Sequence, residues 1–318
     1  MTTHTTLGVS GPQIFPLALG GNTFGWTSDR KTTFSVLDAF VDGGGNFIDT
    51  ADGYSAWAPG NVGGESETLI GEWLSTRGDR DRVIVGSKVS QHPNYRGLAP
   101  DNVRAAADAS LRRLQTDRID LYYAHFDDPT VPLADTAAAF DALVKTGKVR
   151  QIGLSNYTGE RVAQWLRIAA DEGLAAPTVI QPHYNLVKRQ PFESDIAPVV
   201  RAHQLAVVPY FSLASGFLTG KYRTDADFSG AAREGMARPY FSPAGLDVVN
   251  TLVDIARDHS VEPATIALAW LLAQPSVVAP IASARTVDQL PALIRAGSVT
   301  LTPAQRAALD EASARVKN

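Results

Sequence analysis

Residues 82–125 have the sequence RVIVGSKVSQHPNYRGLAPDNVRAAADASLRRLQTDRIDLYYAH, and the expected fold class follows from it. The stretch begins and ends with short runs of apolar, β-branched or aromatic residues, at 82–89 and 120–125. Between the runs, apolar residues recur at the spacing of one helix face: Val103, Ala107, Leu111 and Leu114. Near-continuous apolar strands separated by an amphipathic helix are typical of a parallel sheet.

The same alternation continues along the chain. A second helical face is spaced as Val162, Trp165, Leu166 and Ala169. Six further apolar runs bring the number of candidate strands to eight: 17–21, 46–50, 149–156, 178–184, 205–211 and 277–283. Eight such units predict an α/β protein with the (β/α)8 TIM barrel architecture. No linker or shift in composition divides the chain, so we expect residues 1–318 to form a single barrel domain.

The segments outside the eight units also carry signals. LGVSGPQIF (7–15) has a turn signal between two short runs, which predicts an N-terminal β-hairpin at the bottom of the barrel. Thr302 as N-cap, Pro303 in the first turn and Gln305 as capping-box partner predict an extra C-terminal helix. Residues 222–245 are polar and contain glycine, and we expect a long loop there.

Composition narrows the function class. The net charge of −4 and the charged content of 19% do not suggest a nucleic-acid partner. The chain has no cysteine, which excludes thiolate catalysis, disulfides and zinc–thiolate sites. The absence of a signal core or a membrane-length apolar run favours a cytoplasmic enzyme. Abundant alanine and an excess of arginine over lysine fit a bacterial genome rich in GC, and no coiled-coil pattern stands out, which favours a monomer.

Polar residues cluster where the apolar runs end. In a barrel of this type the active site lies at the C-terminal ends of the strands. Each residue alone could be a turn, cap or rim residue, but the fold would bring all of them to one face. The residues are Asp49 and Tyr54, Lys88, His125, Ser155, Asn156, Gln181, Tyr210, Ser283 and Arg285.

These residue types could deliver a proton. An ammonium about 4 Å from a phenol stabilises the phenolate by about 4 kcal/mol at intermediate dielectric, so Lys88 would bring the pKa of Tyr54 toward neutrality. Tyr54 would then be a proton donor to a carbonyl oxygen. Asp49 would hold Lys88 on the side away from Tyr54, and His125 would orient the carbonyl.

The chain resembles the aldo-keto reductase superfamily in an ordered set of motifs. They are DTADGY (49–54), VGSKV (85–89), DLYYAHFDDP (120–129), GLSNY (153–157), VIQPHYNL (179–186), ASGFLTGKY (214–222) and PIASARTVDQL (280–290). The resemblance covers nearly the whole chain. It implies a barrel that binds NADPH at its mouth and reduces an aldehyde or ketone without metal or flavin, with Asp49, Tyr54, Lys88 and His125 as the catalytic tetrad.

The resemblance also implies cofactor contacts. Ser155, Asn156 and Gln181 would hold the nicotinamide carboxamide, and Tyr210 would stack on its ring. The remaining contacts would come from a strap over the pyrophosphate and from the segment after the last strand: Phe211, Ser212, Leu213, Gly216, Lys221, Ser283, Arg285 and Gln289. Arg285 would meet the 2′-phosphate, whereas Gln289 could equally serve a capping box with Thr286.

The chain departs from the family pattern at two places. Ala292 and Leu293 replace a Glu-Asn pair that contacts adenine in many members, and Phe211–Ser212 replaces a Ser-Pro pair. The small-molecule carbonyl substrate is not specified, but aromatic residues beside the predicted mouth suggest an apolar pocket. They are Trp26, Trp57 and Phe126, next to Tyr54.

The sequence lacks the motifs of several other functions. GFLTGKY is not a phosphate loop, because only three residues separate Gly216 from Gly220, and the chain has no G-x-G-x-x-G motif. The six histidines lack metal-ligand spacing, so no metal site is expected. Two alternatives stay open: a Schiff-base lyase or aldolase that uses Lys88, and a cofactor-sensing binding subunit on the same fold.

Overall fold

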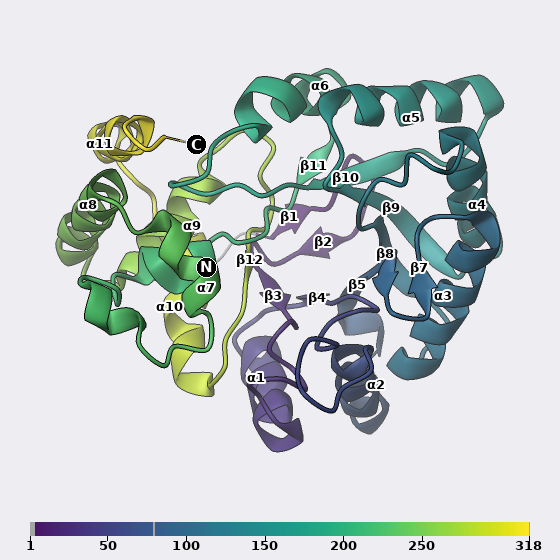
Figure 1. Ribbon diagram of the computed structural model, residues 1–318, viewed down its shortest axis with the longest axis horizontal. Coiled ribbons are helices and arrows are strands. Elements are labelled where there is room, and N and C mark those ends of the chain that lie inside the picture. Colours follow the sequence, from purple (N-terminus) through teal and green to yellow (C-terminus); the bar gives the residue numbers. More distant parts are fainter. Residues whose placement is uncertain (1–3, 79, 318) are drawn as a thin grey trace.

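The computed structural model describes residues 4–78 and 80–317, and its centre is a curved sheet of parallel strands (Figure 1). Eight strands follow the spatial order β11-β10-β9-β8-β5-β4-β3-β12. They are β3 (Ala18–Gly20), β4 (Phe47–Asp49), β5 (Ile84–Val89), β8 (Ile119–Ala124), β9 (Val149–Ser155), β10 (Pro177–Gln181), β11 (Ala206–Val207) and β12 (Ile281–Ala282). Each predicted run overlaps one of these strands, which confirms the predicted fold class.

A seam between the two end strands closes the barrel. Val207 on β11 forms a parallel bridge with Val277, a few residues before β12. The Val207 amide donates to the Ser276 carbonyl at 2.8 Å, and the Ile281 amide on β12 donates to Pro209 at 2.9 Å. We call this contact the seam.

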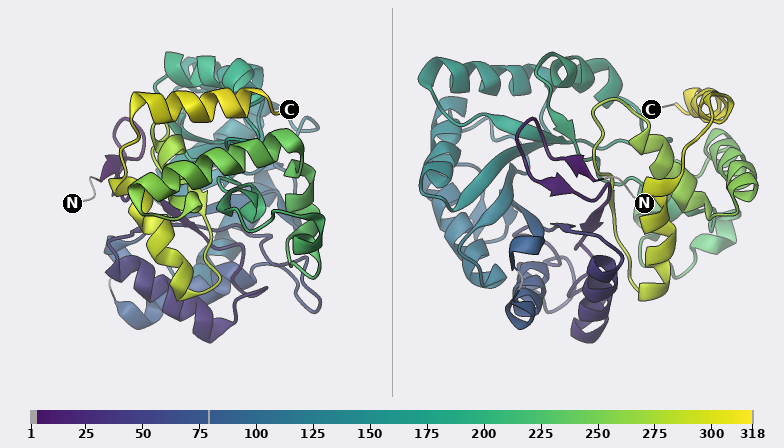
Figure 2. Two further views of the ribbon diagram at one scale, coloured as in Figure 1. Left: turned by 90° about the vertical axis from the view of Figure 1, so that its left-hand side faces the viewer. Right: turned by 180° about the vertical axis from the view of Figure 1, so that it is seen from behind.

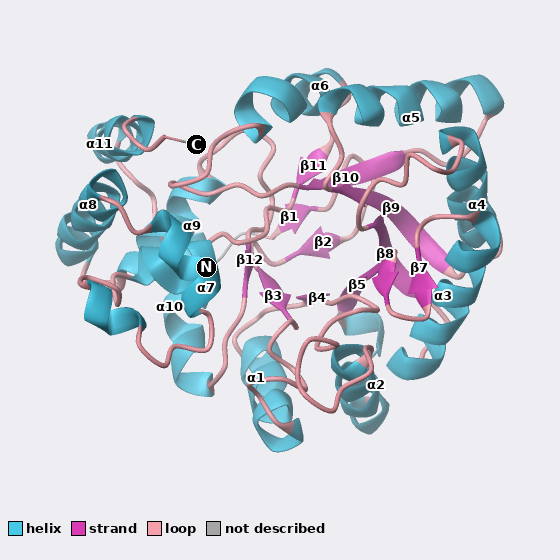
Figure 3. Cartoon of the chain, viewed as in Figure 1, coloured by secondary structure: helices cyan, strands magenta, loops and turns pink. Residues whose placement is uncertain are grey.

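Helices surround the sheet on its outer face (Figures 1 and 3). In α3 (Pro100–Leu114), Val103, Ala107 and Leu114 of the predicted apolar face are buried, and Leu111 packs against the same core while partly buried. The C-terminal helix begins at the predicted Thr302–Gln305 capping box. The helices are α1 (Arg30–Asp42), α2 (Glu65–Arg77), α3 (Pro100–Leu114), α4 (Leu133–Lys145), α5 (Gly159–Glu172), α6 (Ala197–Ala202), α7 (Glu234–Ala237), α8 (Pro243–His259), α9 (Pro263–Leu272), α10 (Leu290–Ile294) and α11 (Pro303–Ala314).

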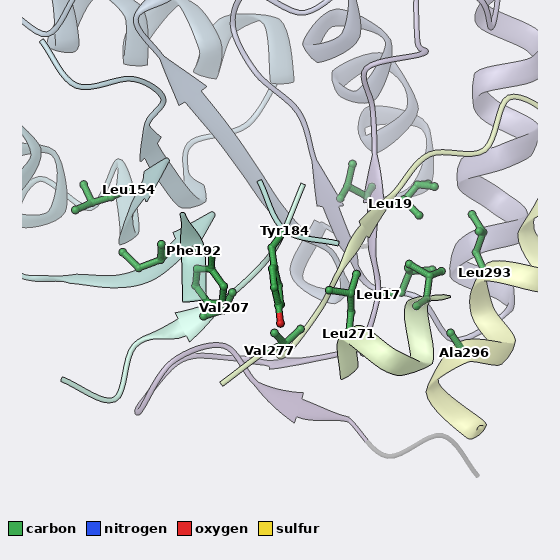
Figure 4. Close-up of a cluster of buried hydrophobic side chains, with 14 of the residues drawn as sticks. Leu17, Leu19, Leu154, Tyr184, Phe192, Val207, Leu271, Val277, Leu293 and Ala296 are labelled. Atoms are coloured by element: carbon green, nitrogen blue, oxygen red, sulfur yellow. The ribbon is translucent and has the colours of Figure 1, made fainter. Parts of the chain in front are cut away.

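Successive residues of each strand point to opposite faces of the sheet, and this alternation builds two apolar cores. On β4, Phe47 belongs to the core inside the barrel, whereas Ile48 belongs to the core between sheet and helices. On β8, Leu121 and Tyr123 point inward and Tyr122 outward. Figure 4 shows part of the outer core, which includes Leu17 just before β3, Leu19 and Val207 from the strands, and Leu271 and Leu293 from the helices.

The predicted hairpin covers one end of the barrel. Strands β1 (Thr5–Thr6) and β2 (Gln13–Ile14) pair antiparallel, and Leu7 and Ile14 are buried in the inner core. The Gln151 side chain donates to the Leu7 carbonyl at 3.0 Å, which ties the hairpin to β9. Figure 2 shows the hairpin at the end opposite the long loops that follow the strands.

Two segments differ from the expectation. The predicted loop 222–245 contains short helices: a 3₁₀ turn at Asp225–Phe228, α7, a second turn at Arg238–Tyr240 and the start of α8. Local capping explains them, because Thr224 and Asp227 form a capping box and Ser242 caps α8. A small hairpin after β5, formed by β6 (Gln91–His92) and β7 (Tyr95–Arg96), was not predicted. No helix in the described ranges has the length and apolar content needed to cross a membrane.

Candidate active site

Strand alternation brings Asp49 and Lys88 to one place inside the barrel. Asp49 ends β4 two residues after the inward-facing Phe47, and Lys88 lies on the neighbouring β5 at an inward position. The Lys88 ammonium donates to Asp49 Oδ2 at 2.7 Å, to the Thr50 carbonyl at 2.7 Å and to the Tyr54 hydroxyl at 3.1 Å. Lys88 and Asp49 are 0% and 1% exposed, so the ion pair is dry. Each of the three ammonium hydrogens therefore has an acceptor.

Burial dominates the acidity of Tyr54. Burial raises the pKa of Tyr54, Lys88 lowers it, Asp49 raises it again, and the pKa ends above its ordinary value. The expectation that Lys88 brings the Tyr54 pKa toward neutrality is therefore wrong, because desolvation of the phenolate outweighs the nearby ammonium. Tyr54 stays protonated across the neutral range and can donate that proton.

His125 lies beside Tyr54, with the two ring centroids 6.3 Å apart. Burial, and then the charge of Lys88, holds the pKa of His125 well below its usual range, so the ring is neutral. Within the described part of the chain its buried Nδ1 has no hydrogen-bond partner. A neutral imidazole can share a hydrogen bond with a carbonyl oxygen without bringing a charge into the site.

The predicted nicotinamide residues form one hydrogen-bonded group. Gln181 donates to Asp49 Oδ1 at 2.9 Å, so it also fixes the partner of Lys88. The Tyr210 hydroxyl donates to Asn156 Oδ1 at 2.7 Å, and Tyr210 stacks on His183 at 5.2 Å. Ser155 is buried, and its hydroxyl donates to the Gln181 carbonyl at 2.9 Å. Ser155 thus supports Gln181 from behind.

A cavity of about 1330 Å³ opens over this group. Every predicted site residue lines the cavity except Lys88 and Ser155, which lie just behind its wall. The residues brought together are Asp49, Tyr54, His125, Asn156, Gln181, Tyr210, Phe211, Ser212, Leu213, Gly216, Lys221, Ser283, Arg285, Gln289, Trp26, Trp57 and Phe126. The cavity is larger than a typical pocket for one small ligand and can hold a long cofactor and a substrate together.

One end of the cavity is cationic. Burial lowers the pKa of Lys221, and the charges of Arg285 and Arg233 lower it further. None of these three cations forms an ion pair with another described residue. Arg233, which sequence reasoning missed, donates to Asn22 at 3.2 Å. Unpaired cations facing one cavity fit a ligand with phosphate groups.

Comparison with known proteins agrees with this geometry. The profile of the Aldo/keto reductase family matches residues 16–314. This chain belongs to the aldo/keto reductase family. Protein tas of Escherichia coli is 35% identical, over 90% of this chain and 89% of its own length. The uncharacterized oxidoreductase YrpG of Bacillus subtilis is 33% identical, over 94% and 92%. Norsolorinic acid reductase B of Aspergillus parasiticus is 33% identical, over 94% and 81%.

At the far end of the cavity of this aldo/keto reductase, Thr286 and Gln289 do not form the capping box that was one of the two predictions for Gln289. The Thr286 side chain makes no cap hydrogen bond. Instead, Gln289 Oε1 accepts from the Arg285 amide at 2.8 Å and fixes the backbone of that arginine. Ala292 and Leu293 line the same end, which therefore has an apolar wall.

A second buried polar cluster lies behind the loop that carries Tyr54 in this aldo/keto reductase. Asp52 is buried two residues before Tyr54. Glu67 is also buried and pairs with Arg113 at 2.7 Å and with the Ser87 hydroxyl. Burial, and then the charge of Glu67, raises the pKa of Asp52 to about 8. Asp52 is therefore protonated in the folded protein at neutral pH.

The stability of the protein should fall as pH rises through this range. The folded pKa of Asp52 lies above its ordinary value of 3.8, so its contribution is complete below about 4 and is lost as pH approaches about 8. The slope from this group is at most about 1.4 kcal/mol per pH unit. Chemical denaturation at several pH values between about 4 and about 8 measures this: the unfolding free energy of Asp52→Asn should fall less steeply with pH than that of the parent. Equal slopes would mean that Asp52 ionises normally.

Proposed function

We propose that this aldo/keto reductase reduces an aldehyde or ketone to an alcohol with NADPH, with Tyr54 as proton donor. The observation that carries the proposal is the Tyr54 hydroxyl, which is 3.1 Å from Lys88 Nζ and opens into the cavity beside His125. Bound NADPH would supply a hydride to the carbonyl carbon. Tyr54 would give its proton to the carbonyl oxygen while Lys88 stabilises the phenolate that forms.

The chain's own residues fit this cofactor. The amides of Asn156 and Gln181 face the cavity and suit a carboxamide, and the ring of Tyr210 suits stacking on a nicotinamide. His183 covers one face of that ring, and the Asn156 contact fixes its edge. The cations Lys221 and Arg285 suit the phosphates. These groups would hold the reacting carbon near Tyr54, as hydride transfer requires.

The names of the relatives support a reductase function. Several of them are named norsolorinic acid reductases, and another is named an oxidoreductase. For this chain we also propose, as the simplest arrangement, one catalytic domain that acts as a cytoplasmic monomer.

The Schiff-base alternative is disfavoured by the state of Lys88. Burial lowers the pKa of Lys88, but Asp49 and Tyr54 outweigh burial and the pKa is raised. A charged lysine whose three hydrogens are all donated is a poor nucleophile. Trapping with borohydride and substrate should therefore leave Lys88 unmodified.

A screen of aldehydes and ketones for NADPH consumption tests the proposal. We expect turnover with at least one carbonyl class. Binding of NADPH without turnover on any class would favour the cofactor-sensing alternative, and failure to bind NADPH would reject both.

We expect Arg285→Ala to weaken NADPH binding about tenfold and NADH binding little, because an arginine strengthens contacts with the 2′-phosphate. We expect no more than about a tenfold loss because Arg285 is exposed, and solvent weakens the interaction of an exposed charge with its partner. Fluorescence titration with both cofactors measures it. An equal loss for NADPH and NADH would show that Arg285 holds the loop rather than the phosphate.

A further inference from the structure

The cavity has an aromatic half beside the proposed proton donor. The Trp57 ring lies 6.0 Å from the Tyr54 ring and 5.7 Å from the Trp26 ring. On the other side, the Phe126 ring lies 4.9 Å from the His125 ring. A carbonyl held between Tyr54 and His125 would thus carry its substituent between aromatic walls. Flat aromatic groups fill such a slot with the largest contact area.

The hairpin of β6 and β7 forms the outer edge of this half. Gly53 packs against it so closely that an added Cβ would lie 3.1 Å from the Gln91 backbone. At its other end, the Leu98 amide donates to Asp128 at 2.9 Å, in the loop that carries Phe126. The hairpin therefore spans the loop of Tyr54 and the loop of Phe126, and both Gln91 and Arg96 line the cavity there.

Arg96 is an unmatched charge at the outer edge of this half of the cavity. Asp49 is bonded to Lys88, and Arg233 lies over the Trp26 ring, 5.9 Å from its centroid. The remaining charged residues of the lining come from the cofactor end: Lys221, Glu262, Arg285 and Asp288. The facing loop, which carries Phe126, has two acidic residues, and both have other partners. Asp127 pairs with Arg161 at 2.7 Å, and Asp128 accepts hydrogen bonds from the amides of Leu98 and Thr130. Arg96 itself makes no ion pair with the rest of the described chain.

We propose that Arg96 is an anion-binding subsite at the outer wall of the substrate pocket, and that the substrate is an aromatic aldehyde or ketone with an acidic group. The proposal rests on the reductase function above. The carbonyl would sit at Tyr54 and His125, the ring between Trp57 and Phe126, and the acidic group at the guanidinium, with Gln91 as a neutral donor beside it. Arginine binds carboxylates through paired hydrogen bonds, which gives both affinity and orientation.

Matched acids and esters test the subsite. The probes are para-carboxybenzaldehyde and its biphenyl homologue, each beside its methyl ester, so that ring and carbonyl are constant. We expect the wild type to prefer one of the acids, and Arg96→Gln to lower the acid-to-ester ratio of kcat/KM about fivefold through KM. Arg96→Glu should lower the ratio about tenfold or more, because like charges repel. The rates on the esters should stay within about twofold, and Arg112→Gln, on the outer side of α3, should change neither.

An acid-to-ester ratio that is the same in wild type and Arg96→Glu at both lengths would overturn the proposal and leave the reductase function intact. Failure of the wild type to reduce either ester or acid would instead count against the reductase function. In that case, quenching of tryptophan fluorescence by benzoate against methyl benzoate, in wild type and Arg96→Glu, still decides whether Arg96 binds the anion.

Discussion

Tyr54→Phe should lower the rate of carbonyl reduction by about 10²–10⁴-fold, because it removes general acid catalysis and little else. The ring remains, so its contacts with Trp57 at 6.0 Å and His125 at 6.3 Å survive. Lys88 loses one acceptor but keeps Asp49 and Thr50. The free energy of unfolding should thus change by no more than about 1.5 kcal/mol.

Two measurements separate chemistry from binding in this variant. Steady-state kinetics should show the loss in kcat/KM, and fluorescence titration should show NADPH affinity close to the parent's. If Tyr54→Phe instead reduced aldehydes at nearly the parent rate, Tyr54 would be only an aromatic residue of the turn.

Lys88→Met should affect both activity and stability. The rate should fall about as much as in Tyr54→Phe, because the phenolate that forms would lose its neighbouring cation. In addition, Asp49 would be left as a buried, unpaired carboxylate, and breaking one side of a buried ion pair destabilises a protein by about 3–5 kcal/mol. Chemical denaturation near neutral pH measures the second effect.

The double variant Asp49→Asn with Lys88→Met is the matched control. It removes the stranded charge while the amide at position 49 can still meet Gln181, which contacts Asp49 at 2.9 Å. Much of the lost stability should return and the activity should not. A single Lys88→Met variant as stable as the parent would mean that Asp49 is solvated or protonated once Lys88 is gone.

The sequence predicted the eight strands because parallel strands in a barrel are buried on both faces and appear as continuous apolar runs. The placement of Asp49 and Lys88 followed from the same pattern, since polar residues at the ends of such runs share one face. The sequence did not predict Tyr123 as a neighbour of Lys88, because a tyrosine within an apolar run has the pattern of an ordinary strand residue. In the structure the centroid of its ring lies 5.6 Å from the Lys88 ammonium.

Two features depended on tertiary structure. Arg233 reaches the cavity only because residues 222–245 fold as short capped helices across the mouth, and a polar stretch gives no periodic signal for that. The pKa of Tyr54 depends on how completely water is excluded. Sequence reasoning weighed the charge of Lys88, whereas the fold adds a desolvation effect of opposite sign.

The seam between β11 and β12 gives the barrel one side with short strand pairing, opposed to a side with long strand pairing. Its two strands have two residues each, whereas β5 and β8, which carry Lys88 and lead to His125, have six. Local opening at the seam breaks fewer ladder hydrogen bonds than opening between β5 and β8. The segments that line the cationic end of the cavity, at 211–221 and 283–289, follow the seam strands in the sequence. We therefore expect local opening mainly on the side where the proposed cofactor would enter and leave, while β5 and β8 hold Lys88 and His125 in place.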